Sequence, residues 1–477
     1  MVFSSTTFLF VFLPVTLVAV WLSPASIRRF VLLAASVCFY IWGVQEFVLV
    51  VIGSTLLDWA IALGIRRAHE RERRTLAAAL LTLGIVQNLG LLAYYKYAGF
   101  LAEQIDKLSS WLGHPGTLTV SVLLPIGISF FTFEKISYDI DVWRRDVDPK
   151  RDPTQVLLFV FLFPRSIAGP IVRLREIQDD LWRPTPRVEQ ISDGATRFAW
   201  GLAKKVLVAD QISAIADSAF ASAATGTLTT PAAWIGALAY SLQLYFDFSG
   251  YSDMAIGIGM MLGFRLPENF NRPYSSVSIT DFWRRWHMTL SRWFRDYVYI
   301  SLGGNRHGER ATYRNLIVVF VLTGFWHGAA WAFVLWGLYH GAWMLIERRM
   351  EWRAVDGAVR MPWLRRATTF LIVLLGWVLF RAESLPLAGR YYHAMFVPVG
   401  GIPETVRAAL SHQSVTVLVL ASVVLLLPGS ISGGRWITER LGAIPSFARL
   451  ATVGLVLPLA LVFVMSSTFH PFLYFQF

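Results

Sequence analysis

The stretch "TGFWHGAAWAFVLWGLYHG", Thr323 to Gly341, is apolar enough to lie in a membrane, yet it carries His327 between two tryptophans. An ionisable side chain inside a bilayer is costly, and such groups are kept where they are hydrogen-bonded or used. His327 is therefore either a functional residue or a packing residue whose imidazole is hydrogen-bonded to a neighbouring carbonyl. Its surroundings favour function. The second histidine of the stretch, His340, fits packing better.

The position of His327 along the chain predicts that it lies deep. It follows Arg314 by thirteen residues, or about 20 Å along a helix at about 1.5 Å per residue. A second apolar run from Ala329 ends at Glu347, so we expect a hairpin with Gly328 near its apex. Non-helical backbone at such depth is tolerated only against protein or a water-filled cavity. The hairpin thus predicts a cavity beside His327.

The rest of the chain is similarly apolar. Of its 477 residues, 55% are hydrophobic, 14% are aromatic and only 16% are charged, which excludes an ordinary soluble protein of this length. Runs of roughly 20 apolar residues, enough to cross about 30 Å of hydrocarbon, recur from end to end. They predict an all-α polytopic membrane protein with roughly 11 to 13 transmembrane or re-entrant helices. The predicted spans are residues 7–23, 30–45, 47–65, 75–96, 118–140, 154–170, 195–220, 231–263 (broken), 314–327, 329–347, 366–381, 414–428 and 449–467.

The net charge of +12 indicates a membrane orientation rather than nucleic-acid binding. Basic clusters recur in alternate loops, which we expect to face the cytoplasm and its anionic lipids, with both termini outside. These clusters are residues 28–29, 66–74, 144–151, 348–366 and 435–449.

The first apolar run has no basic residue before it, so it is a retained span and not a cleaved signal. The single Cys38 allows neither a disulfide framework nor a cysteine metal site.

Residues 266–314 break the pattern because they are rich in Arg and Trp and have no clean hydrophobic window. The stretch "SITDFWRRWHMTLSRWFRDYVYI" starts with a capping-box-like Ser-x-x-Asp and continues with helical periodicity. It predicts an interfacial amphipathic helix over residues 278–302, with His287 on its aromatic face. Alone, His287 is better explained by contact with lipid headgroups than by chemistry.

A cluster of polar residues interrupts the apolar run before this segment. Asp247, Ser249, Tyr251, Ser252 and Asp253 surround Gly250, which favours a kinked helix that lines a channel. The alternative is that these side chains only satisfy backbone groups freed at the kink. There is no phosphate-binding or dinucleotide motif and no HExxH, so we expect no bound cofactor and no metal site. An anionic substrate would have to meet a group of arginines, although such residues more often form a leaflet-facing collar: Arg284, Arg285, Arg292, Arg295 and Arg306.

Several of these stretches, in this order, resemble the membrane-bound O-acyltransferase (MBOAT) family, and within it the bacterial alginate O-acetyltransferase branch. They are "YFDFSGYSDMAIGIGMMLGF", "PENFNRPY", "DFWRRWHMTLSRWFRDYVYISLGG" and "TGFWHGAAWAFVLWGLYHG", supported by "FFTFEKISYDIDVWR", "IAGPIVR", "GLAKKVLVAD" and the terminal "PFLYFQF". The resemblance covers nearly the whole chain. It implies a ring of tilted helices around a thin, funnel-shaped centre.

The resemblance also implies roles for individual residues. His327 matches the family's catalytic histidine and His287 its second active-site position. We expect substrate and donor contacts from Asp247, Tyr251, Asp253, Asn269, Trp283, Arg284, Arg285, Arg292 and Trp326. Three positions depart from the usual pattern: Glu134 and Arg165 stand where Gln is usual, and Ser166 replaces an apolar residue.

The implied activity is O-acetyl transfer from a cytoplasmic thioester, acetyl-CoA, to a hydroxyl of an extracytoplasmic polysaccharide, directly or through an exported SGNH-type partner protein. The implied location is a bacterial inner membrane. Alternatives are teichoic-acid D-alanyl transfer from a carrier-protein thioester and acylation of lipid or protein by longer chains. Outside enzymes, the alternatives are a polysaccharide or ion transporter and a structural scaffold. The tail residues Phe472, Tyr474, Phe475 and Phe477 resemble a partner-binding tail, or else form an aromatic belt.

We expect one integral-membrane domain over residues 1–477. Within it, residues 7–140 form N-terminal helices and residues 154–347 form the catalytic core. Residues 366–477 form C-terminal helices and the tail.

Overall fold

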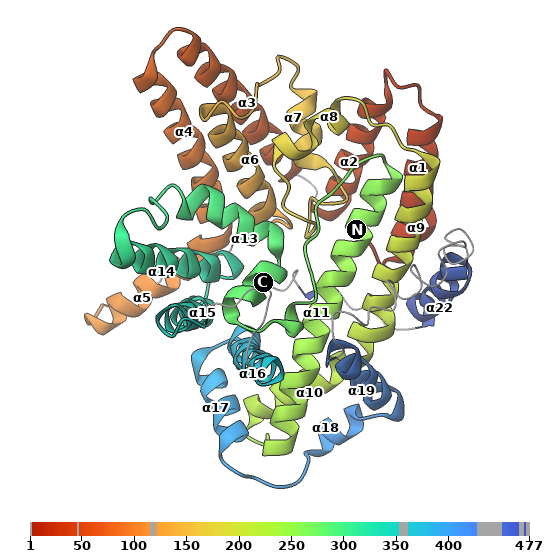
Figure 1. Cartoon of the computed structure of the whole chain (residues 1–477), viewed down its shortest axis with the longest axis vertical. Helices are drawn as coiled ribbons and strands as arrows, with labels where there is room; N and C mark the ends of the chain where they lie inside the picture. The colour runs from red at the N-terminus through yellow and green to blue at the C-terminus, as the bar shows by residue number, and fades with distance from the viewer. Residues whose placement is uncertain are drawn as a thin grey trace. The chain divides into compact units, whose positions relative to one another are not determined.

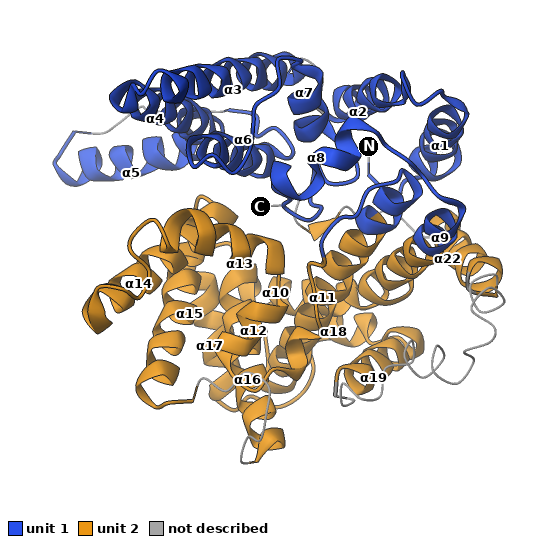
Figure 2. Cartoon of the chain, turned by 45° about the horizontal axis from the view of Figure 1, so that its top comes forward, with its two compact units in different colours: residues 1–195, 255–267 blue, residues 196–254, 268–477 orange. Residues whose placement is uncertain are grey.

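All regular secondary structure in the described residues is helical, as the apolar runs predict. The computed structural model describes residues 2–44, 47–114, 120, 122–352, 361–426, 451–466 and 472–473. It divides into two compact units, residues 1–195 with 255–267 and residues 196–254 with 268–477 (Figure 2). Two helices, α9 (Val188–Ala203) and α11 (Thr230–Met261), contribute residues to both units.

The first unit consists mainly of the N-terminal helices, drawn red to yellow in Figure 1. Helices α3, α4 and α6 pack side by side in it. Besides part of α9 and the end of α11, its helices are η1 (Phe8–Phe12), α1 (Leu13–Leu22), α2 (Arg28–Val44), α3 (Phe47–Glu70), α4 (Arg74–Leu92), η2 (Ala93–Tyr97), α5 (Ala98–Trp111), α6 (Ile128–Trp143), α7 (Thr154–Phe161) and α8 (Leu174–Trp182).

A buried charge pair holds α3 and α6 together. Lys135 Nζ lies 3.2 Å from Asp58 Oδ2, and neither side chain is exposed. Lys135 also donates to Ser54 Oγ at 2.8 Å, while the amide of Asn88 on α4 donates to Asp58 at 2.8 Å. Charges inside a membrane segment are stable only when paired and hydrogen-bonded. This network therefore explains how three apolar helices accommodate ionic groups.

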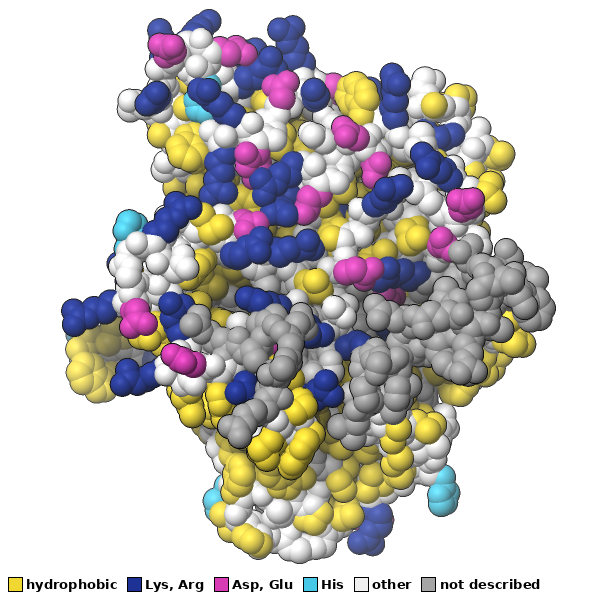
Figure 3. All heavy atoms as spheres, in the orientation of Figure 1, with side chains coloured by type: hydrophobic (Ala, Val, Ile, Leu, Met, Phe, Trp, Pro, Cys, Tyr) yellow, Lys and Arg dark blue, Asp and Glu magenta, His cyan; other side chains and the backbone are white. Residues whose placement is uncertain are grey.

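Two basic loops that the charge pattern predicts to share one side of the membrane do lie together. Arg66, near the end of α3, pairs with Asp148 at 2.9 Å and with Glu70 at 2.9 Å. Trp59 donates its indole hydrogen to the carbonyl of Lys150 at 2.9 Å. Figure 3 shows Lys and Arg side chains interleaved with Asp and Glu over the α3–α4 end of this unit. The first unit thus carries a charged surface in which both signs alternate.

The predicted span 154–170 is wrong in its second half. Helix α7 ends at Phe161, and an irregular loop follows in which residues 162–172 are all buried. Arg165 of this loop is fully buried and pairs with Glu134 of α6. Gly127 and Gly169 have no room for a β-carbon beside the loop, because the backbone of Ser166 and of Arg165 lies against them. Close backbone packing and a buried ion pair therefore replace the expected helix.

The second unit is drawn green to blue in Figure 1. Its helices include a hairpin that carries the opening stretch of sequence. Besides parts of α9 and α11, they are η3 (Lys204–Ala209), α10 (Asp210–Thr225), η4 (Pro273–Ser275), α12 (Ile279–Arg285), α13 (Met288–Phe294), η5 (Arg295–Tyr299), α14 (Gly308–His327), α15 (Trp331–Arg349), α16 (Pro362–Arg381), α17 (Leu385–Phe396), α18 (Glu404–Ala409), α19 (His412–Leu426), η6 (Thr452–Val456) and α22 (Leu457–Ser466).

Two predictions for this region need correction. The expected single helix over 278–302 is two short helices, α12 and α13, followed by η5, and the break falls at His287, whose φ is 42°. The aromatic side chains of its predicted aromatic face are buried within the protein: Phe282, Trp283, Trp286, Trp293, Phe294 and Tyr297. The expected break of α11 at Gly250 is absent: a β-carbon there would meet the carbonyl of Gly201, so this glycine serves close packing against α9.

Four helical runs among the described residues are long and apolar enough to cross a membrane: Phe47–Glu70, Arg74–Trp111, Val188–Thr225 and Pro362–Arg381. Three shorter runs, Phe8–Leu22, His412–Leu425 and Val453–Ser466, are also apolar. Apolar side chains point outward from several of these helices, which suits contact with lipid. The chain is accordingly a multi-pass membrane protein.

Candidate active site

The hairpin predicted around Gly328 is confirmed. Helices α14 and α15 lie against each other, joined by residues 328–330. A β-carbon on Gly324 would meet the backbone of Phe333, and one on Gly337 would meet the carbonyl of Phe320. Small residues at such positions let membrane helices approach closely. The two glycines therefore fix the crossing point one turn before His327.

His327 is the last residue of α14 and is surrounded by aromatic rings. Only 4% of it is exposed. Its ring centroid lies 4.9 Å from that of Trp326, 5.1 Å from Trp336 and 5.2 Å from Phe380. Gly328, directly after it, is extended, with φ −166° and ψ 152°. The imidazole is thus held by three rings at the point where the helix ends.

His287 occupies the turn between α12 and α13. The backbone of residues 269–271 runs along this turn, with Met288 N bonded to Asn269 O and Asn271 N bonded to Arg285 O, both at 2.9 Å. A residue other than glycine with φ in the left-handed region is uncommon, and such residues cluster at functional sites. The turn points the buried imidazole inward, away from the lipid face expected from a continuous helix.

The partner of His287 determines which ring nitrogen carries hydrogen. His287 Nδ1 lies 3.0 Å from Asn269 Oδ1, which also accepts from the backbone N–H and the hydroxyl of Thr289 at 3.3 and 3.0 Å. Asn269 Nδ2 lies 3.2 Å from Ser252 Oγ, so the amide orientation is set. An amide oxygen only accepts, so Nδ1 is the donor and Nε2 carries the lone pair. Burial lowers the pKa of His287 to about 3, which keeps this ring neutral.

The two histidines lie in one cluster because both contact Trp326. The ring centroids of His287 and Trp326 are 6.1 Å apart, and those of Trp326 and His327 are 4.9 Å apart. Thus the sequence-predicted pair, forty residues apart in the chain, comes together in the second unit. Trp326, predicted as a substrate contact, lies between them.

A carboxylate that the sequence analysis did not single out connects the two histidine segments. Glu347, near the end of α15, accepts hydrogen bonds from the backbone N–H groups of Ile279 and Thr280, the latter at 3.0 Å. These are the first N–H groups of α12, which need acceptors outside the helix. Ser278 caps the same end through Asp281 N at 3.0 Å, as its sequence predicts. Glu347 therefore clamps the helix before His287 onto the hairpin of His327.

His340 lies on the same hairpin within an aromatic cage, as expected for a packing residue. It is fully buried, and its ring centroid is 5.3 Å from Trp283 and 5.1 Å from Trp336. Trp283 is thereby part of this cage and contacts Phe320 as well, at 5.4 Å. Trp283 also contacts Trp336, whose ring lies against His327.

The two aspartates predicted as donor contacts belong to separate ionic networks. Asp253 lies 2.9 Å from Arg197 and 2.5 Å from Lys204. Arg197 also binds Glu268. Asp247 pairs with Lys205 at 2.8 Å, and Lys205 pairs with Asp210 at 2.7 Å. The sequence shows both lysines in "GLAKKVLVAD" but gives no signal for these partners.

The predicted arginines differ in exposure. Arg284 is exposed, and Arg292 is half-buried. Arg285 pairs with Asp281 one turn earlier, at 2.8 Å. An exposed arginine is available to an anionic ligand, whereas Arg285 is already engaged, so Arg284 is the better placed of the three for a phosphate.

The predicted tail lies partly within the described residues. Phe472 is buried, stacked on Tyr251 with centroids 4.7 Å apart. Tyr474, Phe475 and Phe477 lie outside the described residues. Tyr251, predicted as a substrate contact, is therefore a neighbour of the tail.

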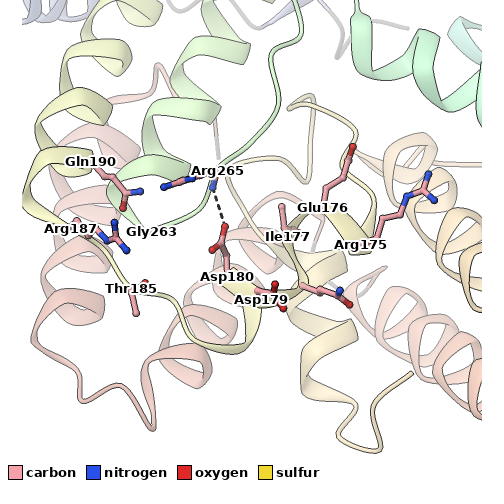
Figure 4. Close-up of a pocket in the computed structure, with 11 residues that line it drawn as sticks. Arg175, Glu176, Ile177, Asp179, Asp180, Thr185, Arg187, Gln190, Gly263 and Arg265 are labelled. Atoms are coloured by element: carbon pink, nitrogen blue, oxygen red, sulfur yellow. Dashed lines mark hydrogen bonds between the residues drawn. The ribbon is translucent and has the colours of Figure 1, made fainter. Parts of the chain in front are cut away.

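Both units contain cavities, and one in each is defined by its lining residues. In the first unit a polar pocket of about 270 Å³ is lined by residues 175–180, Thr185, Arg187, Gln190, Gly263 and Arg265. Figure 4 shows Arg187, Gln190 and Arg265 gathered at one end, with Asp180 accepting from the backbone N–H of Arg265 at 3.4 Å. In the second unit a mainly apolar cavity of about 690 Å³ lies between α11, α16 and α19. Neither is lined by His287 or His327, so the cavity expected beside His327 stays a prediction.

Comparison with known proteins identifies the family. Residues 116–382 match the sequence model of MBOAT, the membrane-bound O-acyltransferase family. The chain is 43% identical to a probable alginate O-acetylase of Azotobacter vinelandii over 507 aligned residues that cover 100% of both chains. It is 47% identical to the corresponding protein of Pseudomonas aeruginosa over 90% of this chain and 81% of that one. It is 36% identical to a peptidoglycan O-acetyltransferase of Helicobacter pylori over 83% of this chain and 80% of that one.

These matches confirm the resemblance drawn from the sequence motifs and decide against the transporter alternative. The helical, apolar structure agrees with them. The chain therefore belongs to the membrane-bound O-acyltransferase family and is a multi-pass membrane O-acyltransferase.

Proposed function

We propose that the chain transfers acetyl groups from a cytoplasmic thioester, acetyl-CoA, to a hydroxyl of an extracytoplasmic polysaccharide such as alginate. Full-length similarity to alginate O-acetylases supports this acceptor class. The transfer is direct or passes through an exported SGNH-type partner protein. The enzyme works in a bacterial inner membrane with both termini outside. No bound cofactor is needed, because imidazole can perform the proton transfers.

The observation that carries the proposal is the pairing of His287 and His327 around Trp326. An acyl transfer from a thioester to a hydroxyl needs one group to take the hydroxyl proton and another to hold the oxygen in place. A ring with a strongly lowered pKa is a poor proton acceptor, so His287 suits positioning. His327 is left as the general base.

The proposed step runs as follows. The imidazole of His327 takes the proton of the acceptor hydroxyl while that oxygen attacks the thioester carbonyl. The tetrahedral adduct then breaks its C–S bond, and the imidazolium returns the proton to the leaving thiolate. The products are the acetyl ester and free CoA thiol, and both histidines are again neutral. His287 accepts a hydrogen bond from the hydroxyl through Nε2, while its Nδ1 donates to Asn269.

Donor binding is proposed at Arg284, in the last turn of α12. Arg284 is exposed and offers a planar guanidinium suited to phosphate. Removing its charge should raise KM for acetyl-CoA and leave kcat nearly unchanged, because phosphate contacts far from the reacting carbon act on binding.

The test is acetyl transfer from labelled acetyl-CoA to an oligosaccharide by the purified chain with its exported partner. We expect His327→Ala to lose at least about 10²-fold in kcat, the usual contribution of a general base. His393→Ala is the matched control, since His393 is an exposed histidine of the same unit. Undiminished turnover of His327→Ala overturns the mechanism. Turnover with a carrier-protein D-alanyl thioester, and none with acetyl-CoA, would select the D-alanyl alternative.

A further inference from the structure

The last described residues of the chain are seated inside the second unit. Phe472 is 1% exposed and Leu473 is 5% exposed. The backbone N–H of Leu473 donates to Asp247 Oδ2 at 2.9 Å. A hydrogen bond to a buried carboxylate is roughly twice as strong as one between neutral groups. The tail therefore has a defined attachment point on α11.

That attachment point is itself held in place. Asp247 is 1% exposed, and its other oxygen lies 2.8 Å from Lys205 Nζ. Lys205 belongs to η3, a π-helical turn, and also binds Asp210 at 2.7 Å. Short π-helical turns are rare and occur frequently at functional sites. One oxygen of Asp247 is thus fixed by a lysine, and the other holds the tail.

The ring of Phe472 leads from this attachment to His287. It stacks on Tyr251, with centroids 4.7 Å apart and planes at 28°, and packs on Phe248 at 5.8 Å. Phe248 in turn meets His287 edge to face, at 4.8 Å and 89°. All four rings belong to the second unit, so the C-terminal segment contacts the active-site histidine through a single intervening phenylalanine.

We propose that Phe472 and Leu473 are positioning residues of the active site. Fixed by Asp247, the tail presses Phe248 against His287 and keeps the imidazole in the orientation set by Asn269. Asp247 is thereby assigned to the tail and not to donor binding. This inference rests on the proposed function only because acetyl transfer is the reaction used to measure it. It is independent of whether the residues beyond Leu473 engage a partner protein.

The sharpest variant is Leu473→Pro, because proline removes the one N–H that binds Asp247. Leu473→Ala keeps that N–H and should retain more activity. Phe472→Ala removes the ring, and Phe472→Tyr restores it. Leu455→Ala is the control substitution, because Leu455 is an exposed residue just before α22. All variants are made in the full chain and assayed with the exported partner.

We expect Leu473→Pro and Phe472→Ala to lower kcat by about 10- to 10²-fold, the cost of misplacing a reacting group by about 1 Å. KM for acetyl-CoA should change by less than about 2-fold, because donor contacts are untouched. Phe472→Tyr should recover most of kcat. A parallel fall of kcat in all four tail variants with loss of folded protein would indicate packing alone and overturn the proposal.

A second arm needs no turnover. Diethyl pyrocarbonate modifies exposed neutral imidazoles, and mass spectrometry reports the rate at the peptide that carries His287. We expect faster modification of His287 in Leu473→Pro than in the parent, with Leu455→Ala unchanged. Equal rates together with parental kcat overturn the positioning role. If the parent itself transfers no acetyl group, the proposed function fails, while the modification rates still decide the role of the tail.

Discussion

The Nδ1 atom of His287 lies 3.0 Å from Oδ1 of Asn269, and this contact sets the tautomer of the buried ring. Second partners of this kind fix both the orientation and the basicity of an active histidine. The same oxygen binds Thr289 at the start of α13, so one side chain organises the ring and the helix that follows it. The sequence predicts Asn269 as a substrate contact, and the structure places its amide oxygen against Nδ1 of His287.

Replacement of Asn269 should therefore act through His287. Asn269→Leu removes the acceptor and frees the ring to take either tautomer. We expect kcat for acetyl transfer to fall by about 10- to 10²-fold, within the range of positioning effects on proton transfer. Asn269→Asp keeps an acceptor oxygen and should retain more activity. Equal activities of the two variants would contradict this role.

The lowered pKa of His287 predicts a stability that depends on pH. The ring is neutral in the folded protein, with a pKa of about 3, and titrates near about 6.5 when unfolded. Below about pH 6.5 only the unfolded chain takes up this proton, so the stabilisation is full above that pH and is lost as pH falls toward 3. Thermal unfolding in detergent should show a smaller acid-induced drop in Tm for His287→Gln than for the parent. Parallel pH curves would refute this.

The glycine contact in the hairpin predicts a strong steric effect. A β-carbon on Gly337 would meet the backbone carbonyl of Phe320, which cannot move aside without separating α14 from α15. We expect Gly337→Ala to cost about 1–3 kcal/mol of unfolding free energy and to lower activity by shifting His327. Gly389→Ala on α17 is the control, since its β-carbon meets nothing within 4 Å. A stable, active Gly337→Ala protein would show that the crossing tolerates separation.

The Glu134–Arg165 pair predicts non-additive mutations. Removing one partner leaves the other charge buried and unpaired, at a cost of about 3–5 kcal/mol. Glu134→Gln and Arg165→Gln should each destabilise the chain, and the double variant should recover much of the loss. Denaturation of the four proteins closes a double-mutant cycle. Additive losses would exclude a coupled pair.

The features that the sequence predicts well are those with a local cause. Periodicity and apolar length predict helices such as α14 and α16, and the Gly between two apolar runs predicts the hairpin. The resemblance to MBOAT enzymes points to both histidines. These three deductions need only neighbouring residues or a known motif.

The features that were missed depend on residues far apart in the chain. Helical periodicity over 278–302 is intact, yet Asn269 and Glu347 stabilise a break at His287 that no local pattern reveals. The apolar run after α7 fits a span equally well, but a buried arginine and two crowded glycines turn it into a loop. Tertiary partners decide such cases against local propensity.

The buried loop of residues 162–172 has a consequence for how this chain can vary. Loops are usually where related proteins gain or lose residues, because their backbone faces solvent and added length is cheap. Here every position is enclosed, and irregular backbone within a membrane protein needs its protein surroundings. An added residue would find no space, and a deletion would disturb the packing around the loop. We therefore expect this segment, irregular as it is, to keep a constant length while the exposed helix connections of the same unit lengthen and shorten freely.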